Sequence, residues 1–354
     1  MANLKRIGVL TSGGDAPGMN SVIRAVTRTA ISNGVEVVGI IGGYSGLVND
    51  RIRPLTARDV SGIESLGGTI LYSDRCAEFK TEEGMAKAVE TCHKYHLDGI
   101  VACGGDGTFR GATDLSNRGI PTIGIPGTID NDIASSEYSI GYDTAMNTAV
   151  GAIDNLRDTC ESHARCNVVE VMGNKAGSIA IQTAIACGAV GCVITERPFD
   201  EEALYDKMIK LRKDGKRGFI VVVGEMIPFY ADEQFAKKIE ENTGIETRFA
   251  RLAHVVRGGN PSLRDRVTAA KMGSEAVKEL ICGKSNLVIC ERNNKIVSLD
   301  INLAQTADRI YKGKDGIQAM NMYPEEDKAL IKRIVDSKKQ YFKDMTVLLA
   351  DLTC

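Results

Sequence analysis

The feature that most constrains the fold of this chain is the regular alternation of short apolar runs with helical patterns. Seven runs rich in β-branched residues recur along the sequence, at 6–10, 35–40, 99–102, 121–125, 167–171, 192–195 and 219–223. They are continuously apolar, which predicts strands that helices cover on both faces. Between the runs, Leu204, Met208 and Leu211 have the spacing of one helical face. This alternation predicts an α/β fold with mainly parallel sheets and right-handed crossovers.

Length, charge and cysteine content narrow the class of protein. A chain of 354 residues is long enough for two domains. Its 44 basic and 46 acidic residues give a net charge of −2, which argues against a nucleic-acid partner. We find no apolar stretch of about 20 residues, as a membrane span requires, and no signal-like region after the first methionine. Ten cysteines without a C-x-x-C pair predict reduced thiols in a cytoplasmic protein.

Glycine-rich loops mark where a ligand would bind. Four of them, at 11–20, 103–108, 126–132 and 257–261, stand at strand or helix boundaries. In parallel sheets, ligands bind at the carboxyl ends of the strands, where loops lead into helices. We therefore expect the functional site to be built from these loops.

The loop at 103–108 has the composition of a polyphosphate cradle. Gly104, Gly105 and Gly107 have no Cβ atom, so their amide groups can approach phosphate oxygens closely. A carboxylate at Asp106 would repel a phosphate unless a cation lies between them, and Mg²⁺ bound to the phosphates supplies that cation. The alternative is a tight turn in which Asp106 caps a helix.

The loop at 126–132 places two carboxylates, Asp130 and Asp132, on a segment that must turn. Phosphoryl transfer to a hydroxyl group uses one carboxylate to accept the proton and often a second near the metal. The alternative is an Asx-turn with two solvated aspartates. Because two neighbouring strand ends carry glycine–aspartate clusters, we favour a catalytic site.

The first loop and several cations complete this hypothesis. The loop at 11–20 lacks the G-x-G-x-x-G fingerprint, but Gly14 suits close contact with a nucleotide phosphate. Transfer between two anions requires positive charge around the transferring group. Each candidate cation lies near the boundary of a predicted element and could alternatively form a surface salt bridge. The five candidates are Arg75, Arg165, Arg248, His254 and Arg257.

Taken in order, these motifs resemble the phosphofructokinase family over residues 4–310. The matching segments are 7–20, 104–108, 126–132, 168–173, 246–248 and the stretch from His254 to Gly259. The resemblance implies two doubly wound, Rossmann-like domains with the active site in the cleft between them. It also implies a glycolytic kinase that transfers the γ-phosphoryl group of Mg-ATP to the 1-hydroxyl of fructose 6-phosphate, giving fructose 1,6-bisphosphate.

The resemblance implies a role for each matched catalytic residue. Asp130 resembles the general base that accepts the proton of the sugar hydroxyl, with Thr128 and Asp132 beside it. Asp106 resembles the magnesium ligand, and Arg75 would reach the transferring phosphate.

The resemblance also implies two sets of binding residues. The ATP side comprises Gly14, Tyr44, Arg75, Cys76, Gly105, Asp106, Gly107, Thr108 and Gly111. The sugar-phosphate side comprises Thr128, Asp130, Arg165, Met172, Gly173, Asn174, Glu225, Arg248, His254 and Arg257. Arg165 and Arg248 resemble arginines that grip the sugar phosphate from a neighbouring subunit, which implies an obligate oligomer, usually a homotetramer.

The phosphoryl donor is expected to be ATP. Relatives that use pyrophosphate have an aspartate at the position of Gly107 and a lysine at that of Gly127, whose side chains fill the space of an ATP α-phosphate. Both positions are glycine here. The alternatives that stay open are a pyrophosphate-dependent enzyme, a kinase of another substrate that shares the G-G-D-G loop, and a catalytically weak paralogue that senses sugar phosphates.

The sequence departs from the family pattern at the sugar site. The family has M-G-R where this chain has Met172, Gly173 and Asn174, followed by Lys175. Asparagine keeps hydrogen-bonding capacity but lacks the charge, and the loss of one such donor costs on the order of 10²–10³ in rate.

A second departure concerns the effector site of bacterial relatives. Four residues match its cations: Arg24, Arg28, Arg157 and Lys216. However, Ala57 replaces a usual arginine, Asp214 a usual lysine and Val190 a usual acidic metal ligand. We therefore expect a weakened or altered allosteric response to ADP and phosphoenolpyruvate.

Two domains are expected, each formed from separate parts of the chain. Residues 1–141 and 257–306 would form the larger, ATP-Mg-binding domain. Residues 142–256 and 307–354 would form the smaller, sugar-phosphate domain. Pro324 and the acids that follow it predict the start of a helix in the C-terminal extension, to which we assign no function.

Overall fold

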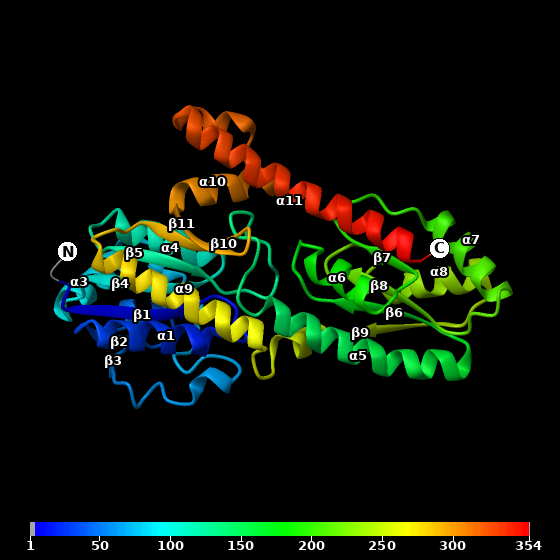
Figure 1. The fold of residues 1–354 in the computed structure, drawn as a ribbon, viewed down its shortest axis with the longest axis horizontal. Helices are drawn as coiled ribbons and strands as arrows, with labels where there is room; N and C mark the ends of the chain where they lie inside the picture. The colour runs from blue at the N-terminus through cyan, green and yellow to red at the C-terminus, as the bar shows by residue number, and fades with distance from the viewer. Residues whose placement is uncertain (1–3, 354) are drawn as a thin grey trace. The chain divides into compact units, whose positions relative to one another are not determined.

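The computed structural model describes residues 4–353, which form two compact units. The first contains the chain up to Ile129, Ile133–Thr144 and Arg257–Asp336, and the second contains Asp130–Asp132, Ala145–Val256 and the chain from Ser337 onward. The colours in Figure 1 show that each unit combines parts of the chain that are far apart in sequence.

The first unit is built on a seven-stranded sheet with the order β11-β10-β5-β4-β1-β2-β3. The strands are β1 (Arg6–Ser12), β2 (Glu36–Ile40), β3 (Ile52–Leu55), β4 (Gly99–Gly104), β5 (Thr122–Pro126), β10 (Leu287–Arg292) and β11 (Lys295–Asp300). The five strands from β10 to β2 run parallel, and the two edge strands run antiparallel to their neighbours. The predicted parallel α/β class is confirmed.

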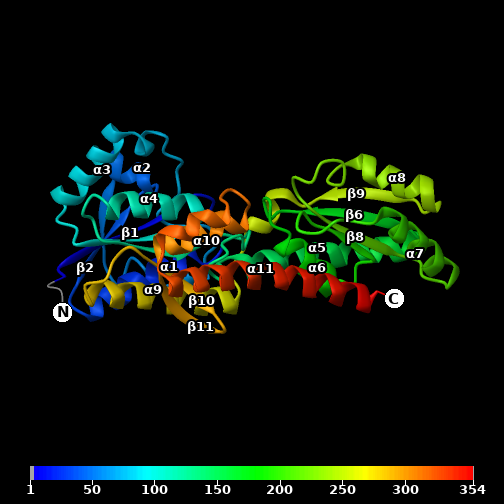
Figure 2. The same ribbon diagram turned by 90° about the horizontal axis from the view of Figure 1, so that it is seen from above.

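Helices cover both faces of this sheet. They are α1 (Met19–Ser32), α2 (Tyr44–Val48), α3 (Glu82–Lys94), α4 (Asp106–Ser116), α9 (Leu263–Ile281) and α10 (Ile301–Tyr311), with 3-10 helices η1 (Ile63–Ser65), η2 (Glu78–Lys80) and η4 (Ile317–Met322). Figure 2 shows α1 and α9 on one face and α2, α3 and α4 on the other. The central strands are fully buried, which explains their continuous apolar runs.

The second unit has a four-stranded, all-parallel sheet with the order β7-β8-β6-β9. Its elements are β6 (Cys166–Val171), β7 (Gly191–Val193), β8 (Phe219–Gly224), β9 (Thr247–Arg251), α5 (Tyr142–His163), α6 (Ser178–Ala186), α7 (Glu201–Lys213) and α8 (Glu233–Thr243). The predicted helical face holds, since Leu204 and Met208 of α7 are buried against Val221 and Phe235 in one apolar cluster. The 3-10 helix η3 (Ala253–Arg257) follows β9.

The C-terminal segment divides in a way that differs from the expected domain ranges. The last helix, α11 (Glu325–Leu352), begins after Pro324 as predicted. Residues 307–336, however, belong to the first unit and not to the second. The reason is apolar packing, because Ala307, Ile331 and Ile334 form a buried cluster with Ala134. Beyond Asp336, α11 belongs to the second unit.

None of the helices formed by residues 4–353 is both long enough and apolar enough to span a membrane.

Candidate active site

Three neighbouring strands of the first unit end at one edge of the sheet. Ser12 at the end of β1 lies opposite Gly104 at the end of β4, and Gly104 lies opposite Pro126 at the end of β5. The loops that begin at residues 13, 105 and 127 therefore start side by side, as the sequence predicted. This edge is the structural basis of the candidate site.

The first loop is held by an arginine from the distant part of the chain. Nη2 of Arg257 donates to the carbonyl oxygen of Asp15 at 2.7 Å, and Nε lies 3.3 Å from Oδ1 of Asp15. A Cβ atom at Gly14 would lie 2.1 Å from Nη2 of Arg257, so a larger residue there would displace this guanidinium group. The structure thus places Arg257, which was expected at the sugar phosphate, beside the first loop.

The second loop touches the first and leaves open space beside Gly105 and Gly107. Oγ1 of Thr108 donates to the carbonyl oxygen of Ser12 at 3.2 Å, which joins the two loops. A Cβ built on Gly107 would meet only Nη2 of Arg110, at 4.0 Å, and one built on Gly105 would meet no described atom within 4 Å. A ligand can therefore approach the main chain here, as a phosphate cradle requires.

Asp106 is the first residue of α4 and is surrounded by positive charge. Its Oδ2 lies 3.3 Å from Nη2 of Arg110 and 4.0 Å from Nζ of Lys314. Arg309, whose pKa is raised mainly by Asp315, also feels the negative charge of Asp106. Lys314 and Arg309 come from the C-terminal part of the first unit, so this segment adds cations beside the predicted phosphate loop.

Tyr44 and Gly111 support the second loop from the core instead of lining a ligand surface. Tyr44 is 5% exposed, its ring stacks on Phe79 with centroids 4.2 Å apart, and its hydroxyl donates to the carbonyl oxygen of Thr108 at 2.6 Å. Burial raises the pKa of Tyr44 well above the ordinary tyrosine value. A Cβ at Gly111 would lie 2.6 Å from Cε2 of Tyr44. Both residues therefore have a packing role, and their direct contact with ATP stays a prediction.

Gly111→Ala is expected to lower the free energy of unfolding by about 1–3 kcal/mol, because the new methyl group overpacks the Tyr44 ring. Displacing that ring also weakens its bond to Thr108, so the KM for ATP is expected to rise. Chemical denaturation and steady-state kinetics measure the two effects. Gly151→Ala in α5 is the matched control, since nothing lies within 4 Å of a Cβ there. Equal stability of the two variants would contradict the packing role.

The third loop is anchored at its start. The amide of Gly127 donates to the carbonyl oxygen of Gly104 at 3.0 Å, and Oγ of Ser139 donates to the carbonyl oxygen of Thr128 at 2.7 Å. A Cβ at Gly127 would lie 2.6 Å from Sγ of Cys103. A side chain at position 127 would therefore meet Cys103 first, and the ligand space expected beside this glycine stays a prediction. The side-chain direction there is filled by the protein, and the open position is Gly107.

The two candidate catalytic carboxylates flank a buried, left-handed residue. Asn131 is 3% exposed and has φ +48°, while Asp130 and Asp132 are partly exposed. Asparagine tolerates this conformation better than most residues. The segment is thus a tight turn, as the alternative interpretation proposed, and both aspartates are partly exposed, although Oδ1 of Asp130 is buried.

Arg75 and Cys76 lie on the segment between η1 and η2. This segment is tied to the end of β1, because Oγ1 of Thr11 donates to the carbonyl oxygen of Tyr72 at 3.0 Å. Asp74 is ion-paired with Arg51 at 2.7 Å. Arg75 is exposed, whereas Cys76 packs partly against the core around Tyr44, so of the two only Arg75 offers a charged group to solvent.

In the second unit, one group of predicted sugar-site residues lies at the carboxyl ends of the strands. Oε1 of Glu225 accepts the amides of Gly173 and Asn174 at 3.0 and 2.6 Å, so Glu225 after β8 holds the turn after β6. Asn174 has φ +55°, a left-handed conformation that asparagine adopts more readily than arginine. The backbone at this position therefore suits the asparagine that replaces the family's arginine. Met172 is partly exposed there, and His254, on η3 after β9, is exposed.

The other two predicted sugar-site cations lie at the opposite ends of the strands. Arg165 directly precedes β6, and Arg248 is the second residue of β9. Glu246, which the sequence analysis did not single out, binds both: Oε2 lies 2.7 Å from Nε of Arg165 and Oε1 lies 2.5 Å from Nη2 of Arg248. The hydrogen bond from Arg165, and then the charge of both guanidinium groups, lowers the pKa of Glu246.

The length of β6 separates these two groups. Arg165 and Met172 stand seven residues apart along an extended strand, which corresponds to about 23 Å. One sugar phosphate cannot span this distance, so Arg165 and Met172 of the same chain do not serve the same bound sugar.

The four predicted effector residues divide between the two units. Arg24 and Arg28 lie on α1, where Arg24 pairs with Glu64 at 3.2 Å. Arg157 lies on α5 near Asp154, and Lys216 lies 5.8 Å from the centre of the Phe219 ring. Val190, at the position of the usual acidic metal ligand, is 5% exposed in the apolar core of the second unit.

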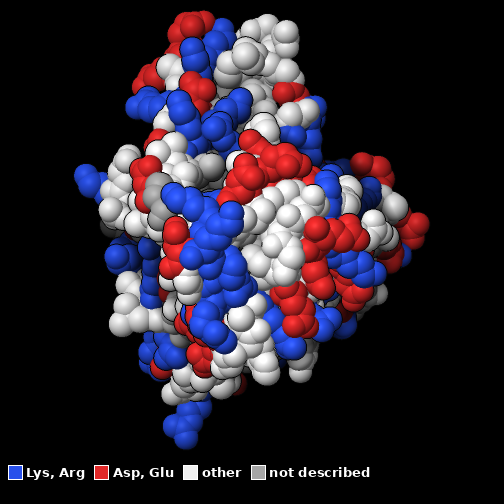
Figure 3. Space-filling model, turned by 90° about the vertical axis from the view of Figure 1, so that its right-hand side faces the viewer, with Lys and Arg blue, Asp and Glu red and all other residues white. Residues whose placement is uncertain are grey.

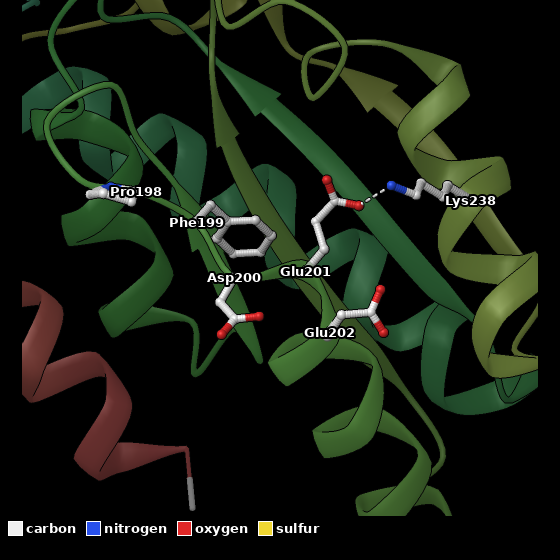
Figure 4. A pocket seen from close by; sticks show the side chains of 6 residues that line it. All are labelled: Pro198, Phe199, Asp200, Glu201, Glu202 and Lys238. Atoms are coloured by element: carbon white, nitrogen blue, oxygen red, sulfur yellow. Dashed lines mark hydrogen bonds and ion pairs between the residues drawn. The ribbon is translucent and has the colours of Figure 1, made fainter.

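The surface carries local concentrations of charge despite the small net charge. Figure 3 shows a band of lysine and arginine side chains, with clusters of aspartate and glutamate beside it. Figure 4 shows a pocket at the start of α7 that is lined by Pro198, Phe199, Asp200, Glu201, Glu202 and Lys238. The ammonium group of Lys238 is paired with Glu201, so the remaining charge in this pocket, on Asp200 and Glu202, is negative. It is not a phosphate site.

Comparisons with known proteins now establish the family. The sequence model of the family described as phosphofructokinase matches residues 6–280 of the 354. The chain belongs to the phosphofructokinase family. It is 48% identical to the ATP-dependent 6-phosphofructokinase of Halalkalibacterium halodurans over 298 residues, covering 84% of this chain and 93% of that protein. It is 46% identical to the ATP-dependent 6-phosphofructokinase 1 of Clostridium perfringens over 308 residues, covering 87% and 96%.

A solved structure agrees with this assignment. The phosphofructokinase of Saccharomyces cerevisiae superposes with a TM-score of 0.81 at 29% identity, over 94% of this chain and 50% of that one. The chain therefore spans half the length of that fungal protein. The family resemblance drawn from the motifs is confirmed.

Proposed function

We propose that this phosphofructokinase family member is an ATP-dependent 6-phosphofructokinase. The observation that carries the proposal is the identity of 46–48% to two enzymes with that name over more than four fifths of the chain. The open approach to the main chain at Gly105 and Gly107 supports a nucleotide donor. In the proposed reaction, the 1-hydroxyl oxygen of fructose 6-phosphate bonds to the γ-phosphorus of ATP as the bond to the β-phosphate oxygen breaks, and ADP leaves.

The residues take the following proposed roles. Asp130 accepts the proton of the sugar hydroxyl, with Thr128 and Asp132 beside it, and Arg75 contributes positive charge at the transferring group. The amides at the start of α4 receive the phosphates of ATP, in the polarity that a helix N-terminus favours. The catalytic effect is chiefly one of position and electrostatics.

Asp106 fits a magnesium ion that arrives with the nucleotide. Mg²⁺ is usually held by one or two carboxylates together with substrate phosphates and water. Within residues 4–353 no group of three or more His, Cys, Asp or Glu side chains could cage a metal, so a resident metal site is not indicated. When bound, Mg²⁺ would neutralise phosphate charge. Arg110 and Lys314, which lie 3.3 and 4.0 Å from Asp106, would add positive charge beside the phosphates.

We further propose that two chains share each sugar site in a homo-oligomer, for which the family suggests a tetramer. The support is the distance of about 23 Å along β6 between Arg165 and Met172. A two-fold symmetric pair of chains can bring the arginine end of one chain to the carboxyl end of the other. In that arrangement, the ion pairs of Glu246 with Arg165 and Arg248 would orient both guanidinium groups towards the sugar phosphate bound by the partner chain.

The proposed setting is the cytoplasm, where thiols stay reduced. The nine cysteines among the described residues are free, which suits that compartment. Effector control is proposed to be weak, because Val190 is part of the apolar core where a metal-binding carboxylate would be needed.

Steady-state kinetics with fructose 6-phosphate test the function and the donor together. We expect turnover with Mg-ATP, a loss of activity on chelation of Mg²⁺, and at least about 100-fold lower kcat/KM with pyrophosphate, because the open cradle at Gly105 and Gly107 leaves room for the α-phosphate of ATP. Preference for pyrophosphate would replace the proposal with a pyrophosphate-dependent transferase. No turnover with either donor, in a folded protein that binds fructose 6-phosphate, would indicate a sugar-phosphate sensor.

A further inference from the structure

The C-terminal helix α11 carries a buried lysine that the mechanism above does not use. Lys338 is 7% exposed, whereas its neighbour Lys339 faces solvent. An ammonium group is almost never buried without a partner, because its desolvation is costly. Nζ of Lys338 donates to the main-chain carbonyl oxygen of Asn131 at 2.8 Å.

This carbonyl group belongs to the turn that carries the candidate base. Asn131 lies between Asp130 and Asp132 and holds a left-handed conformation, with φ +48°. Asparagine adopts this conformation more readily than most residues, and contacts with its surroundings stabilise it further. A charge-assisted hydrogen bond to its carbonyl oxygen is a strong constraint of this kind.

The helix that carries Lys338 is itself fixed to the second unit. Nε2 of Gln182, on α6, donates to the hydroxyl of Tyr341 at 2.6 Å. Phe342 is 1% exposed and Leu349 is 6% exposed. Lys207, on α7, is hydrogen-bonded to Thr353. Lys338 therefore projects from a rigid support, which is what a positioning contact needs.

Lys338 also sits within reach of a second acid. Glu196 accepts the amide of Gly177 at 2.9 Å and lies in an environment that raises its pKa by burial, while the charge of Lys338 acts in the opposite direction. Gly177 is the residue before α6, next to the turn of Gly173 and Asn174. The ammonium group thus bonds to the aspartate turn, and its charge also acts on the acid that holds the neighbouring sugar-side loop.

We propose that Lys338 is a positioning residue of the phosphoryl-transfer site, which fixes the Asp130–Asp132 turn through the carbonyl group of Asn131. The proposal rests on the proposed function, since it assigns the turn a catalytic task. Lys338 lies outside residues 6–280, the part matched by the family model, so this contact is contributed by the C-terminal extension. The extension, to which the sequence suggested no function, thereby takes part in the site.

The test compares Lys338→Met with Lys339→Met on the same helix. We expect Lys338→Met to lower kcat by about 10- to 100-fold, because misplacement of a catalytic group by about 1 Å can cost about 100-fold in rate. The KM for ATP should change less than about twofold, because the carbonyl group that Lys338 binds belongs to the Asp130–Asp132 turn and not to the phosphate cradle. Lys338→Arg should restore part of kcat, and Lys339→Met should resemble the unchanged enzyme. If Lys338→Met does not fold, Lys338→Gln, which keeps a donor, replaces it in every comparison.

A double variant separates positioning from general stability. If Lys338 acts through Asp130, the change Lys338→Met should cost no further kcat in an Asp130→Asn background. An equal loss in both backgrounds would overturn the proposal, as would a kcat of Lys338→Met within twofold of that of Lys339→Met. Inactivity of the unchanged protein towards fructose 6-phosphate and both donors would instead overturn the proposed function, so the two failures are distinguishable.

Discussion

Asp130→Asn is expected to lower kcat for fructose 6-phosphate by about 10³-fold, because asparagine cannot accept the proton of the attacking hydroxyl group. The shape and hydrogen-bonding capacity of the turn are largely retained, since asparagine is nearly isosteric and the left-handed residue is Asn131. The KM for ATP should therefore stay within about twofold of the unchanged value, which would place the loss in the chemical step. Initial rates at saturating concentrations of both substrates measure it.

Asp158→Asn is the matched control for this variant. Asp158 lies on the exposed side of α5, and the same chemical change there should leave kcat unaltered. A loss of less than about tenfold in Asp130→Asn would contradict the role of general base, which contributes 10²–10⁴ in rate. Asp132 would then be the next carboxylate to test.

The same variant tests whether the site is shared between chains. Arg165→Ala removes a cation at the amino end of β6, where Glu246 holds it. If each site takes Asp130 from one chain and Arg165 from another, oligomers assembled from equal amounts of the two variants contain about one quarter of sites with both residues intact. Activity should therefore reappear on mixing under conditions that exchange subunits. If both residues of one site come from the same chain, mixing restores nothing.

The sequence allowed the central strands to be predicted but not the edges of the sheets. Strands such as β4 and β8 are buried on both faces and read as continuous apolar runs. The edge strands β3, β9 and β11 carry mixed polar and apolar residues, because part of each strand is exposed to solvent. A short mixed run of this kind is not distinguishable from a loop by its pattern alone.

The candidate site was predictable to the extent that it follows the ends of parallel strands. That geometry brings the loops after β1, β4 and β5 together, whatever the rest of the fold. Glu246 could have been found, since it stands two residues before Arg248 at the start of a strand and so shares its face. Lys338 could not, because its contact with Asn131 joins residues 207 apart in sequence. No local pattern records such a pairing.

Packing around glycines was the least predictable part. Gly107 and Gly127 look equivalent in sequence, yet a Cβ at the first meets open space and a Cβ at the second would lie 2.6 Å from Sγ of Cys103. Only the structure shows that a side chain has room at position 107 and not at position 127. A substitution at position 107 can therefore be used to test the choice of phosphoryl donor.

Gly107→Asp is expected to lower kcat/KM for ATP by about 10²-fold. The side chain fits, because the nearest described atom to its Cβ is Nη2 of Arg110 at 4.0 Å and the backbone has no positive φ. The new carboxylate would stand in the cradle beside Asp106, where it repels the phosphates. Two unit charges about 5 Å apart interact by roughly 3 kcal/mol at an effective dielectric constant of 20, which corresponds to about a hundredfold. Competition kinetics with ATP and pyrophosphate measure the change for each donor.

Gly107→Asn separates charge from volume in this experiment. Asparagine has nearly the size of aspartate but no charge, so it should retain most of the activity with ATP if repulsion is the cause. The loss in Gly107→Asp should also shrink as the salt concentration rises, since the cradle is open to solvent and screening reaches it. Equal losses in the two variants would mean that the α-phosphate is excluded by volume. Full activity of Gly107→Asp with ATP would show that the nucleotide does not pass over residue 107, and the phosphate cradle would have to be placed elsewhere.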